Sequence, residues 1–340
     1  MLTTKFDIKQ DIYVLFTFVI ILHSCHCCVS ENYCDPLKKA IKSVKNCDTF
    51  CTFSMLSGVT KMIHHKCIKG LYPSSNILRF EIPEDKVPWS VEFEEYQPVE
   101  YNSPVLIGKP WADPDTNDSS FEPKWNLQDG KVNRKSYVKD YEITVDGVPQ
   151  NPIGRTGIIG RGLLGRWGPN HAADPIVTRW KRNGTGALEI DRKSEKPILQ
   201  FVAIERKDSK EWAIPGGMVD QGEKISQTLK REFMEEALDA LDKTPEEREE
   251  LESALKKFFD RDDKIYQGYV DDPRNTDNAW METMALNFHD EDGSTVGEIN
   301  LKAGDDAGNV RWMDVDRKMI LYANHSDFIK QTVHKRNAHW

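Results

Sequence analysis

Cysteine is absent from most of this 340-residue chain, because all seven cysteines lie before residue 68. A disulfide framework is therefore excluded beyond that point. An excess of basic charge is lacking as well, since the formal net charge is −9 at pH 7. No basic field attracts phosphates to the whole chain, so we expect no general nucleic-acid binding, although arginines gathered at one site could still bind a small anion.

Long hydrophobic runs are scarce, and the clearest one lies at the N-terminus. The ten residues Tyr13–Leu22 follow Lys5 and Lys9 and precede small or polar residues. This layout is typical of a secretory signal peptide, and the run is short for a membrane span. We expect residues 1–30 to be such a signal, which sends the chain to the secretory pathway or the extracellular space. The alternative is a retained signal-anchor, and only then would the chain contact a membrane.

Four cysteines follow this segment: Cys34, Cys47, Cys51 and Cys67. An even number in an exported chain indicates two disulfides. Pairing Cys34 with Cys67 and Cys47 with Cys51 is one of three possible pairings. It would staple two short helices into a hairpin over residues 31–70. A loosely ordered Cys-rich leader is the alternative.

Residues 71–130 are rich in proline and aromatic side chains. Prolines break helices and favour extended segments, while the tryptophans and tyrosines indicate a folded region. We therefore expect a smaller, β-rich N-terminal domain over residues 71–180. A glycine-dense stretch, Gly154–Arg182, begins in its last part. Within this stretch Gly160–Gly165 matches G-x-G-x-x-G, but no clear strand precedes the run, so we expect a glycine-rich hinge between domains there rather than a dinucleotide site.

An α/β pattern begins near residue 197 and predicts a second domain over residues 181–340. The expected strands are 198–206, 264–270, 279–289 and 309–315. The expected helices run from about 223 to 241, from 245 to 259 and from 326 to 336. Pro245 in a first turn and Ser326 as a capping residue mark the starts of the last two helices.

Three acids share one face of the helix expected after Gly222. Glu232, Glu235 and Glu236 stand at positions i, i+3 and i+4, where like charges destabilise an isolated helix. A solvated acidic face is the simplest interpretation. A hard divalent cation would offset the repulsion, because Mg²⁺ commonly combines a few carboxylates with phosphate oxygens of a substrate. The pattern therefore favours a magnesium site.

The neighbouring residues fit a helix that docks on a sheet through its other face. An apolar stripe at helical spacing is formed by Ile225, Leu229, Phe233 and Ala237. Gly216 and Gly217, just before the helix, allow a tight turn and a close approach to a ligand. Glu223 is placed to cap or orient the helix start, and Arg231 to pair with Glu223 or with a ligand.

The spacing of these residues resembles a known motif, G-x5-E-x7-R-E-U-x-E-E-x-G-U, in which U is a bulky apolar residue. This motif is the Nudix box, and its matching positions are Gly217, Glu223, Arg231, Glu232, Phe233, Glu235 and Glu236. Leu238 and Asp239 depart from its last two places, where the motif has glycine and an apolar residue. Both lie beyond the acids, so they affect the expected end of the helix rather than the chemistry.

The resemblance extends from about Arg79 to Trp340, through stretches such as NPIGRTGIIGRGLLGRWGPNHAADPIVTRWKR, EWAIPGGMVD and GYVDDPRNTDNAWMET. These resemble the mitochondrial-type ADP-ribose pyrophosphatases of animals and the related C-terminal domain of ADP-ribose-gated melastatin-type channels. The resemblance implies an α/β Nudix fold, a mixed β-sheet sandwiched between helices. It also implies hydrolysis of ADP-ribose to AMP and ribose 5-phosphate with Mg²⁺, or with Mn²⁺ as a second candidate ion. A mitochondrial location is the implied alternative, although Met1–Ser30 lacks the arginine-rich pattern of a transit peptide.

The same resemblance implies roles for particular residues. The metal would be held at Glu232, Glu235, Glu236 and Gly217. The catalytic acids would be Glu235, Glu236, Glu232 and Glu282, with Asp305 and Asp306 as loop alternatives for the general base. Substrate would be bound by Arg155, Arg274, Asp277, Asn278, Tyr322, Asn324 and His325, and Arg161 would lie with Arg155 near the diphosphate. For Tyr322 and His325 an ordinary helix-capping loop is the alternative.

Two other functions stay open. The chain could hydrolyse another nucleoside diphosphate-linked sugar, or bind ADP-ribose as a sensor without cleaving it. The intact Arg231-Glu232-Phe233 run favours a hydrolase, because the sensor domain of vertebrate channels is expected to have a degraded one. We expect a monomer. If the chain is exported, N-glycosylation motifs at Asn117, Asn183 and Asn324 would be exposed, and a glycan on Asn324 would collide with the expected ligand site.

Overall fold

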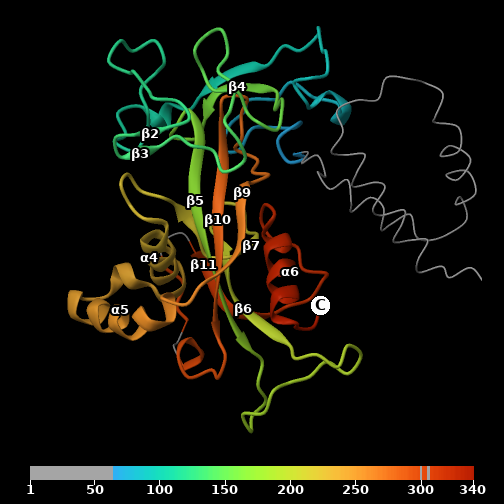
Figure 1. Cartoon of the computed structure of the whole chain (residues 1–340), viewed down its shortest axis with the longest axis vertical. Helices are drawn as coiled ribbons and strands as arrows, with labels where there is room; N and C mark the ends of the chain where they lie inside the picture. Colours follow the sequence, from blue (N-terminus) through green and yellow to red (C-terminus); the bar gives the residue numbers. More distant parts are fainter. Residues whose placement is uncertain (1–63, 299–300, 305–306) are drawn as a thin grey trace, which may run out of the picture. The chain divides into compact units, whose positions relative to one another are not determined.

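A seven-stranded mixed sheet carries the C-terminal part of the chain (Figure 1). The computed structural model describes residues 64–298, 301–304 and 307–340, so the expected signal peptide and most of the Cys-rich segment lie outside the described residues. The strand order is β11-β6-β5-β10-β9, with β7 beside β6 and β8 beside β5. The strands are β5 (Gly168–Trp180), β6 (Leu199–Arg206), β7 (Trp212–Ala213), β8 (Gly217–Met218), β9 (Asp263–Tyr269), β10 (Ala279–Asp290) and β11 (Ala307–Asp314).

The middle of the sheet is the parallel pair β5 and β10, which runs from Gly168 beside Ala279 to Arg179 beside Asp290. The other strand pairs in this sheet are antiparallel. Both central strands are almost fully buried, because other elements cover both faces of the sheet. The four strands expected from the sequence are confirmed to within two residues at each end.

Helices cover the two faces of the sheet. α4 (Ile225–Leu238) and α5 (Pro245–Phe259) lie on one side of the strands in Figure 1, and α6 (His325–Arg336) lies on the other. Successive side chains of β5 pack against the helices on opposite faces of the sheet, because side chains alternate between the two faces along a strand. Val177 packs in the cluster with α4 and α5, whereas Ile176 packs in the cluster with α6. The expected arrangement of a sheet between helices is confirmed.

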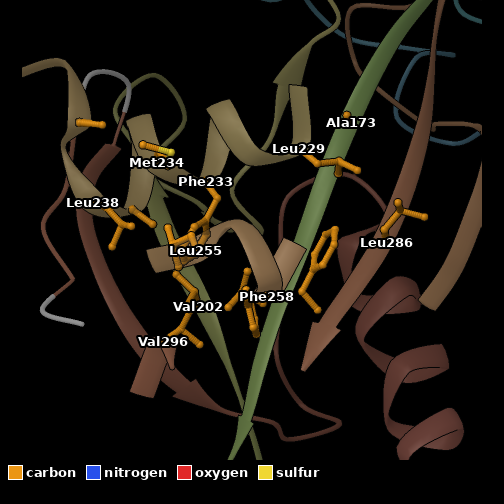
Figure 2. Close-up of a cluster of buried hydrophobic side chains, with 14 residues drawn as sticks. Ala173, Val202, Leu229, Phe233, Met234, Leu238, Leu255, Phe258, Leu286 and Val296 are labelled. Carbon is orange, nitrogen blue, oxygen red and sulfur yellow. The ribbon is translucent and has the colours of Figure 1, made fainter. Parts of the chain in front are cut away.

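The apolar stripe of α4 docks this helix on the sheet. Leu229, Phe233 and Ala237 are fully buried, and Ile225 packs at the edge of the same cluster. Figure 2 shows Leu229 and Phe233 within this cluster, together with side chains from α5. Burying one Leu or Phe side chain stabilises a fold by roughly 1.5–3 kcal/mol. The stripe therefore fixes which face of α4 is left for its acids.

Two helices, α4 and α6, have bounds that differ from the expected ones, while α5 has the expected bounds. α4 is shorter than expected, since it begins at Ile225 and ends at Leu238, where Asp239 adopts a left-handed conformation with φ 52°. α6 begins one residue before Ser326, so the assignment of Ser326 as its capping residue is wrong. Asn324 occupies that position, because a left-handed turn at Ala323 (φ 48°) leads the chain into the helix earlier.

The N-terminal part of the described chain has few regular elements. β1 (Val99–Asn102) pairs in parallel with β4 (Ile158–Gly162), and β2 (Gln128–Asp129) pairs with β3 (Val132–Asn133). Short 3₁₀ turns lie here at Glu84–Lys86 and Pro104–Leu106, and two others lie in the C-terminal part at Ala240–Asp242 and Val296–Glu298. Buried charges stabilise this part instead. The Asp113 carboxylate accepts hydrogen bonds from Arg134 at 2.8 and 3.0 Å and from Arg166 at 2.7 Å.

The hinge expected at Gly160–Gly165 stays a prediction. This run overlaps the end of β4 and leads into β5, which is central to the large sheet. Glycine is required locally: a Cβ on Gly154 or Gly157 would meet the backbone carbonyl of Val87 or Phe80. The domain boundary expected between residues 180 and 181 stays a prediction. β5 lies on the N-terminal side of this boundary, although it is a strand of the large sheet against which the acidic helix packs.

Cys67 is a fully buried free cysteine, in contrast with the disulfide expected at this position. The other three cysteines of the expected pairs lie outside the described residues. Among the described residues, no helix is both long enough and apolar enough to span a membrane.

Candidate active site

The three acids of α4 line one cavity of about 410 Å³ beside the glycine loop. The apolar stripe turns this face of the helix towards β8, which pairs with Ala172 and Ala173 of β5. Glu232 and Glu236 are buried, with 8% and 7% of their surface exposed, whereas Glu235 is half-buried. The expected clustering of these acids on one face is therefore observed, and this face is partly buried rather than fully solvated.

Arg231 holds these acids together. Its Nη1 donates to Glu232 Oε1 at 2.8 Å and to Glu235 Oε2 at 3.1 Å. Its Nε and Nη2 donate to the two oxygens of Glu223, each at 3.0 Å, and Nη2 also reaches the Met218 carbonyl at 3.1 Å. One guanidinium thus offsets much of the repulsion that the acids would otherwise exert on the helix. The expected pairing of Arg231 with Glu223 is therefore observed.

The two loop glycines make room for the acids. The Gly216 N–H donates to Glu236 Oε2 at 2.8 Å. A Cβ on Gly217 would lie 2.5 Å from the carboxylate carbon of Glu232, closer than real side chains approach. A Cβ on Gly216 would meet Oδ1 of Asp174. Glycine is needed at both positions because carboxylates occupy the space beside the backbone.

Burial changes the protonation of this acidic wall. Burial raises the pKa of Glu232 to about 7, and the neighbouring Arg231 offsets only part of this effect. Arg231 itself has a raised pKa, chiefly because it donates to Glu223. A group that binds Glu232 as a carboxylate must therefore compete with a proton near neutral pH.

The same cavity also carries basic and aromatic groups. Arg274 forks onto Asp272, with Nε and Nη2 each 2.8 Å from a carboxylate oxygen, and the Tyr322 hydroxyl donates to Asp272 Oδ2 at 3.1 Å. Arg206 lies over the Tyr322 ring, 4.4 Å from its centroid, and pairs with Asp208 at 2.7 Å. Burial raises the pKa of Asp272, but the Arg274 guanidinium outweighs it and holds this pKa below its usual range. All five residues line the cavity.

A third group of residues that line the cavity is Asp174 with Thr283 and His325. Thr283 Oγ1 donates to Asp174 Oδ2 at 2.6 Å. The Ile214 N–H donates to His325 Nδ1 at 3.0 Å, so the proton of the neutral imidazole is on Nε2, which lies 3.9 Å from Asp174 Oδ1. Burial raises the pKa of Asp174 to about 6 and lowers that of His325 to about 3. At neutral pH His325 is therefore a neutral hydrogen-bond donor to the site.

The structure thus brings together part of the residue set that the sequence predicts. The predicted residues that line this cavity are Gly216, Gly217, Arg231, Glu232, Glu235, Glu236, Arg274, Tyr322 and His325. Sequence reasoning missed Asp174, Arg206, Asp208, Asp272 and Thr283. Two of these gave a signal: Asp272 stands two residues before Arg274, and Asp174 is an acid within an otherwise apolar stretch of β5.

Glu282, another predicted catalytic acid, is not among the residues that line this cavity. It is wholly buried in β10, and its carboxylate accepts hydrogen bonds from Ser136 Oγ at 2.6 Å, Tyr137 N at 2.5 Å and Trp280 Nε1 at 2.7 Å. Burial raises the pKa of this carboxyl. The contacts make Glu282 an anchor for the segment at residues 136–137.

Three more predicted substrate residues are occupied by contacts within the N-terminal part of the chain. Arg155 Nη1 donates to the carbonyls of Lys86 and Pro88, each at 2.8 Å. Asp277 accepts from the Tyr96 hydroxyl at 2.5 Å and from the Thr156 N–H at 2.7 Å. Asn278 accepts from the Gly160 N–H at 2.8 Å and donates to the Pro149 carbonyl at 3.0 Å. These side chains do not line the cavity.

Two further predicted substrate residues, Asn324 and Arg161, do not line the cavity of the α4 acids. Asn324 precedes α6, and its buried Oδ1 has no hydrogen-bond partner among the described residues. Arg161 donates to backbone carbonyls of Asp113 and Gly165 and lies 5.2 Å from the centroid of the Trp167 ring. Asp305 and Asp306 lie outside the described residues.

The donors on the acidic wall fit a hard divalent cation. Glu232, Glu235 and Glu236 offer carboxylate oxygens to one cavity, and such oxygens are what Mg²⁺ prefers. No group of three or more His, Cys, Asp or Glu side chains within the described ranges is already arranged to hold a metal ion. Arg231 Nη1 contacts one oxygen of Glu232 and one oxygen of Glu235, so a cation bound to those same two oxygens would compete with this guanidinium.

A glycine loop packed on an acid-bearing helix, beside a mixed sheet with helices on both faces, defines the Nudix class of hydrolase folds. Residues 180–332 match the family model described as NUDIX domain, and residues 82–168 match the one described as NUDT9-like, N-terminal domain. The chain belongs to the Nudix hydrolases and carries the NUDT9-like N-terminal domain.

Curated relatives agree with this assignment. The chain is 57% identical over 286 residues to a rat protein named "ADP-ribose pyrophosphatase, mitochondrial", covering 84% of this chain and 81% of the relative. It is 50% identical to "Putative nudix hydrolase 6" of Caenorhabditis elegans, over 78% of this chain and 95% of the relative. It is also 48% identical to a Nematostella vectensis protein named as a transient receptor potential channel, over 82% of this chain but only 18% of that relative.

Proposed function

We propose that this Nudix hydrolase cleaves ADP-ribose to AMP and ribose 5-phosphate with Mg²⁺. The observation that carries the proposal is the presence of acidic and basic groups in one cavity. Glu232, Glu235 and Glu236 form an acidic wall, while Arg206 and Arg274 stand in the same cavity. A diphosphate needs both, since its oxygens bind arginines and bridge to a cation held by carboxylates. The rat relative, whose name is that of an ADP-ribose pyrophosphatase, supports the choice of substrate.

The cation would be held by Glu232, Glu235 and Glu236, with Gly217 beside them. When bound, it would neutralise diphosphate charge and make a water molecule more nucleophilic. Glu235 and Glu236 are the candidates for the general base, because each lines the cavity. We leave Glu282 out of this proposal, because its oxygens accept hydrogen bonds from Ser136, Tyr137 and Trp280.

The remaining residues of the cavity would orient the substrate. Arg274 is held by its fork on Asp272, so its charge is fixed in place before a substrate arrives. The Arg206 guanidinium is stacked on Tyr322 and is held in the same way. His325 presents a proton on Nε2 without a positive charge. Together these groups favour a ligand that is anionic in one part and carries hydroxyl groups in another.

Product analysis tests the proposal. The purified protein is incubated with ADP-ribose and Mg²⁺, and the products are separated by chromatography. We expect AMP and ribose 5-phosphate, and no turnover with EDTA. ADP-glucose and UDP-glucose serve as competing substrates: a higher kcat/KM for either one would make the protein a hydrolase of other nucleoside diphosphate sugars. ADP-ribose binding without AMP formation would make it a sensor.

For the location, the name of the rat relative supports the mitochondrial alternative. Export would also place a glycan on Asn324, directly before His325 of the cavity. Expression with a C-terminal fluorescent tag and a mitochondrial marker tests this point. Co-localisation with the marker supports the mitochondrial location, whereas secretion with a mass increase that a glycosidase removes supports export.

A further inference from the structure

The C-terminal end of α4 is covered by the segment Leu301–Gly304. The Lys302 N–H donates to the Ala237 carbonyl at 2.9 Å, and the Gly304 N–H donates to the Glu236 carbonyl at 3.2 Å. The last turn of a helix leaves such carbonyls without partners inside the helix. Lys302 also forms a bridge with Leu238, in parallel. The segment therefore caps the turn of the helix that carries Glu235 and Glu236.

Gly304 lies so close to this turn that no side chain fits there. A Cβ on Gly304 would clash with the carbonyl oxygen of Glu235. It would also lie 2.9 Å from the carbonyl carbon of Glu235 and 3.2 Å from the Cα of Asp239. Backbone atoms cannot swing aside as the end of a flexible side chain can. The constraint is one of space, since Gly304 is not among the glycines with positive φ.

This contact lies beside the position at which the Nudix box has a glycine and this chain has Leu238. Leu238 stands in that place and is buried, with 2% of its surface exposed. The left-handed residue that ends the helix is Asp239, whose carboxylate forms an ion pair with Lys302 Nζ. A non-glycine residue in this conformation needs support from its surroundings. The segment Leu301–Gly304 supplies that support from outside the helix.

We propose that Gly304 is a positioning residue for the hydrolysis: its backbone fixes the last turn of α4 and so places the carboxylates of Glu235 and Glu236 in the cavity. The inference rests on the proposed function, because these acids matter to the reaction only if they hold the cation. A displaced carbonyl of Glu235 would carry both side chains with it. Misplacement of about 1 Å can cost a reaction roughly a hundredfold in rate.

The test compares Gly304→Ala with Gly308→Ala. A Cβ on Gly308 has ordinary room, since its nearest neighbour is the Glu205 carbonyl oxygen at 3.4 Å. For Gly304→Ala we expect a fall in kcat of roughly a hundredfold. We also expect weaker Mg²⁺ binding in calorimetry. The KM for ADP-ribose should stay within about threefold of the wild-type value, because the change affects the metal-binding groups and leaves the other substrate contacts in place. Gly308→Ala should match the wild type in all three measurements.

A second pair of variants covers the case in which Gly304→Ala does not fold. Lys302→Pro removes the N–H that bonds to the Ala237 carbonyl, whereas Lys302→Ala keeps it and removes only the ion pair with Asp239. We expect Lys302→Pro to weaken Mg²⁺ binding in calorimetry and Lys302→Ala to leave it near the wild-type value.

The outcomes separate this inference from the proposed function. Folded Gly304→Ala with wild-type kcat and Mg²⁺ binding would overturn the inference while the function stands. If that variant does not fold, equal Mg²⁺ binding by Lys302→Pro and Lys302→Ala would overturn it instead. A wild-type protein that binds Mg²⁺ but releases no AMP would refute the function. Calorimetry still tests the role of Gly304 in that case, because it measures binding without turnover.

Discussion

Gly217 and Glu232 are packed against each other, so that a Cβ on Gly217 would lie 2.5 Å from the Glu232 carboxylate carbon. The loop glycine and the helix acid thus share one space, although fourteen positions separate them in the sequence. Their contact explains why the glycine and the acids occur at a fixed spacing. The chain can place a carboxylate at the cavity wall only where the facing backbone has no side chain.

Gly217→Ala should therefore impair the reaction more than the fold. The new methyl group pushes Glu232 away from the cavity wall, and we expect kcat to fall by roughly a hundredfold, as for other misplaced catalytic groups. AMP release is the measurement. Gly184→Ala is the control, because no heavy atom lies within 4 Å of a Cβ at that position. Equal activity of both variants would show that Glu232 can move freely, against the account.

Arg274→Lys should weaken substrate binding. A lysine keeps the positive charge but cannot make the two parallel bonds to Asp272, so the charge is no longer held in place. We expect the KM for ADP-ribose to rise about tenfold, or about 1.4 kcal/mol, with kcat within about threefold. The exposed Arg317→Lys is the control. A lower kcat at unchanged KM would place Arg274 in the chemical step instead.

Arg231→Ala should make stability depend on metal. Without Arg231 the carboxylates of Glu232 and Glu235 lose a shared partner, and repulsion between them lowers Tm in EDTA. We expect a fall of about 2–4 °C per kcal/mol of lost stability. Mg²⁺ should raise the Tm of the variant more than that of the wild type, as thermal unfolding with and without EDTA will show. The same Mg²⁺-dependent shift in both proteins would contradict the fit of a cation to these acids.

His64 should make the fold less stable in acid. Burial lowers its pKa from 6.5 to about 4, and the neutral ring lies between the Tyr269 hydroxyl at 2.8 Å and the Arg155 carbonyl at 2.7 Å. Below pH 6.5 the unfolded chain binds a proton that the native state does not. The contribution of His64 is therefore complete above pH 6.5 and is lost as the pH falls towards 4, by up to about 3 kcal/mol.

His64→Gln tests this window, because glutamine offers a donor and an acceptor but does not titrate. Denaturant unfolding is measured from pH 7 to pH 4. The loss of unfolding free energy over this range should be smaller in the variant than in the wild type. The exposed His334→Gln is the control. Parallel pH profiles of His64→Gln and the wild type would contradict a buried neutral imidazole.

The parts of the fold that the sequence predicts are those with local signals. α5 begins at Pro245 after Thr244, which forms a capping box with Glu247, and its predicted bounds are confirmed. β5 has no such signal. Its thirteen residues include glycine, proline, asparagine, histidine and aspartate, and they form a strand because β10 pairs with them along their length. Tertiary pairing outweighs local preference here.

The site divides in the same way. Glu232, Glu235 and Glu236 are predictable because helical spacing alone puts them on one face. Arg274 and Asp277 lie three positions apart in one stretch, yet only Arg274 lines the cavity, while Asp277 bonds to Thr156 and Tyr96. The family resemblance predicts a substrate contact for both residues. Their different contacts depend on a strand and a loop that lie far away in the sequence.

The most direct test of the account is the Mg²⁺ dependence of AMP release in Glu235→Gln and Glu236→Gln, with the exposed Glu250→Gln on α5 as control. Glutamine keeps the shape of each side chain and removes its charge. We expect kcat to fall by roughly a thousandfold, or about 4 kcal/mol of transition-state stabilisation, in both acid variants. Their Tm in EDTA should stay near that of the wild type, and Glu250→Gln should turn over normally. Near wild-type turnover of both variants at the same Mg²⁺ concentration would contradict a cation held by these carboxylates.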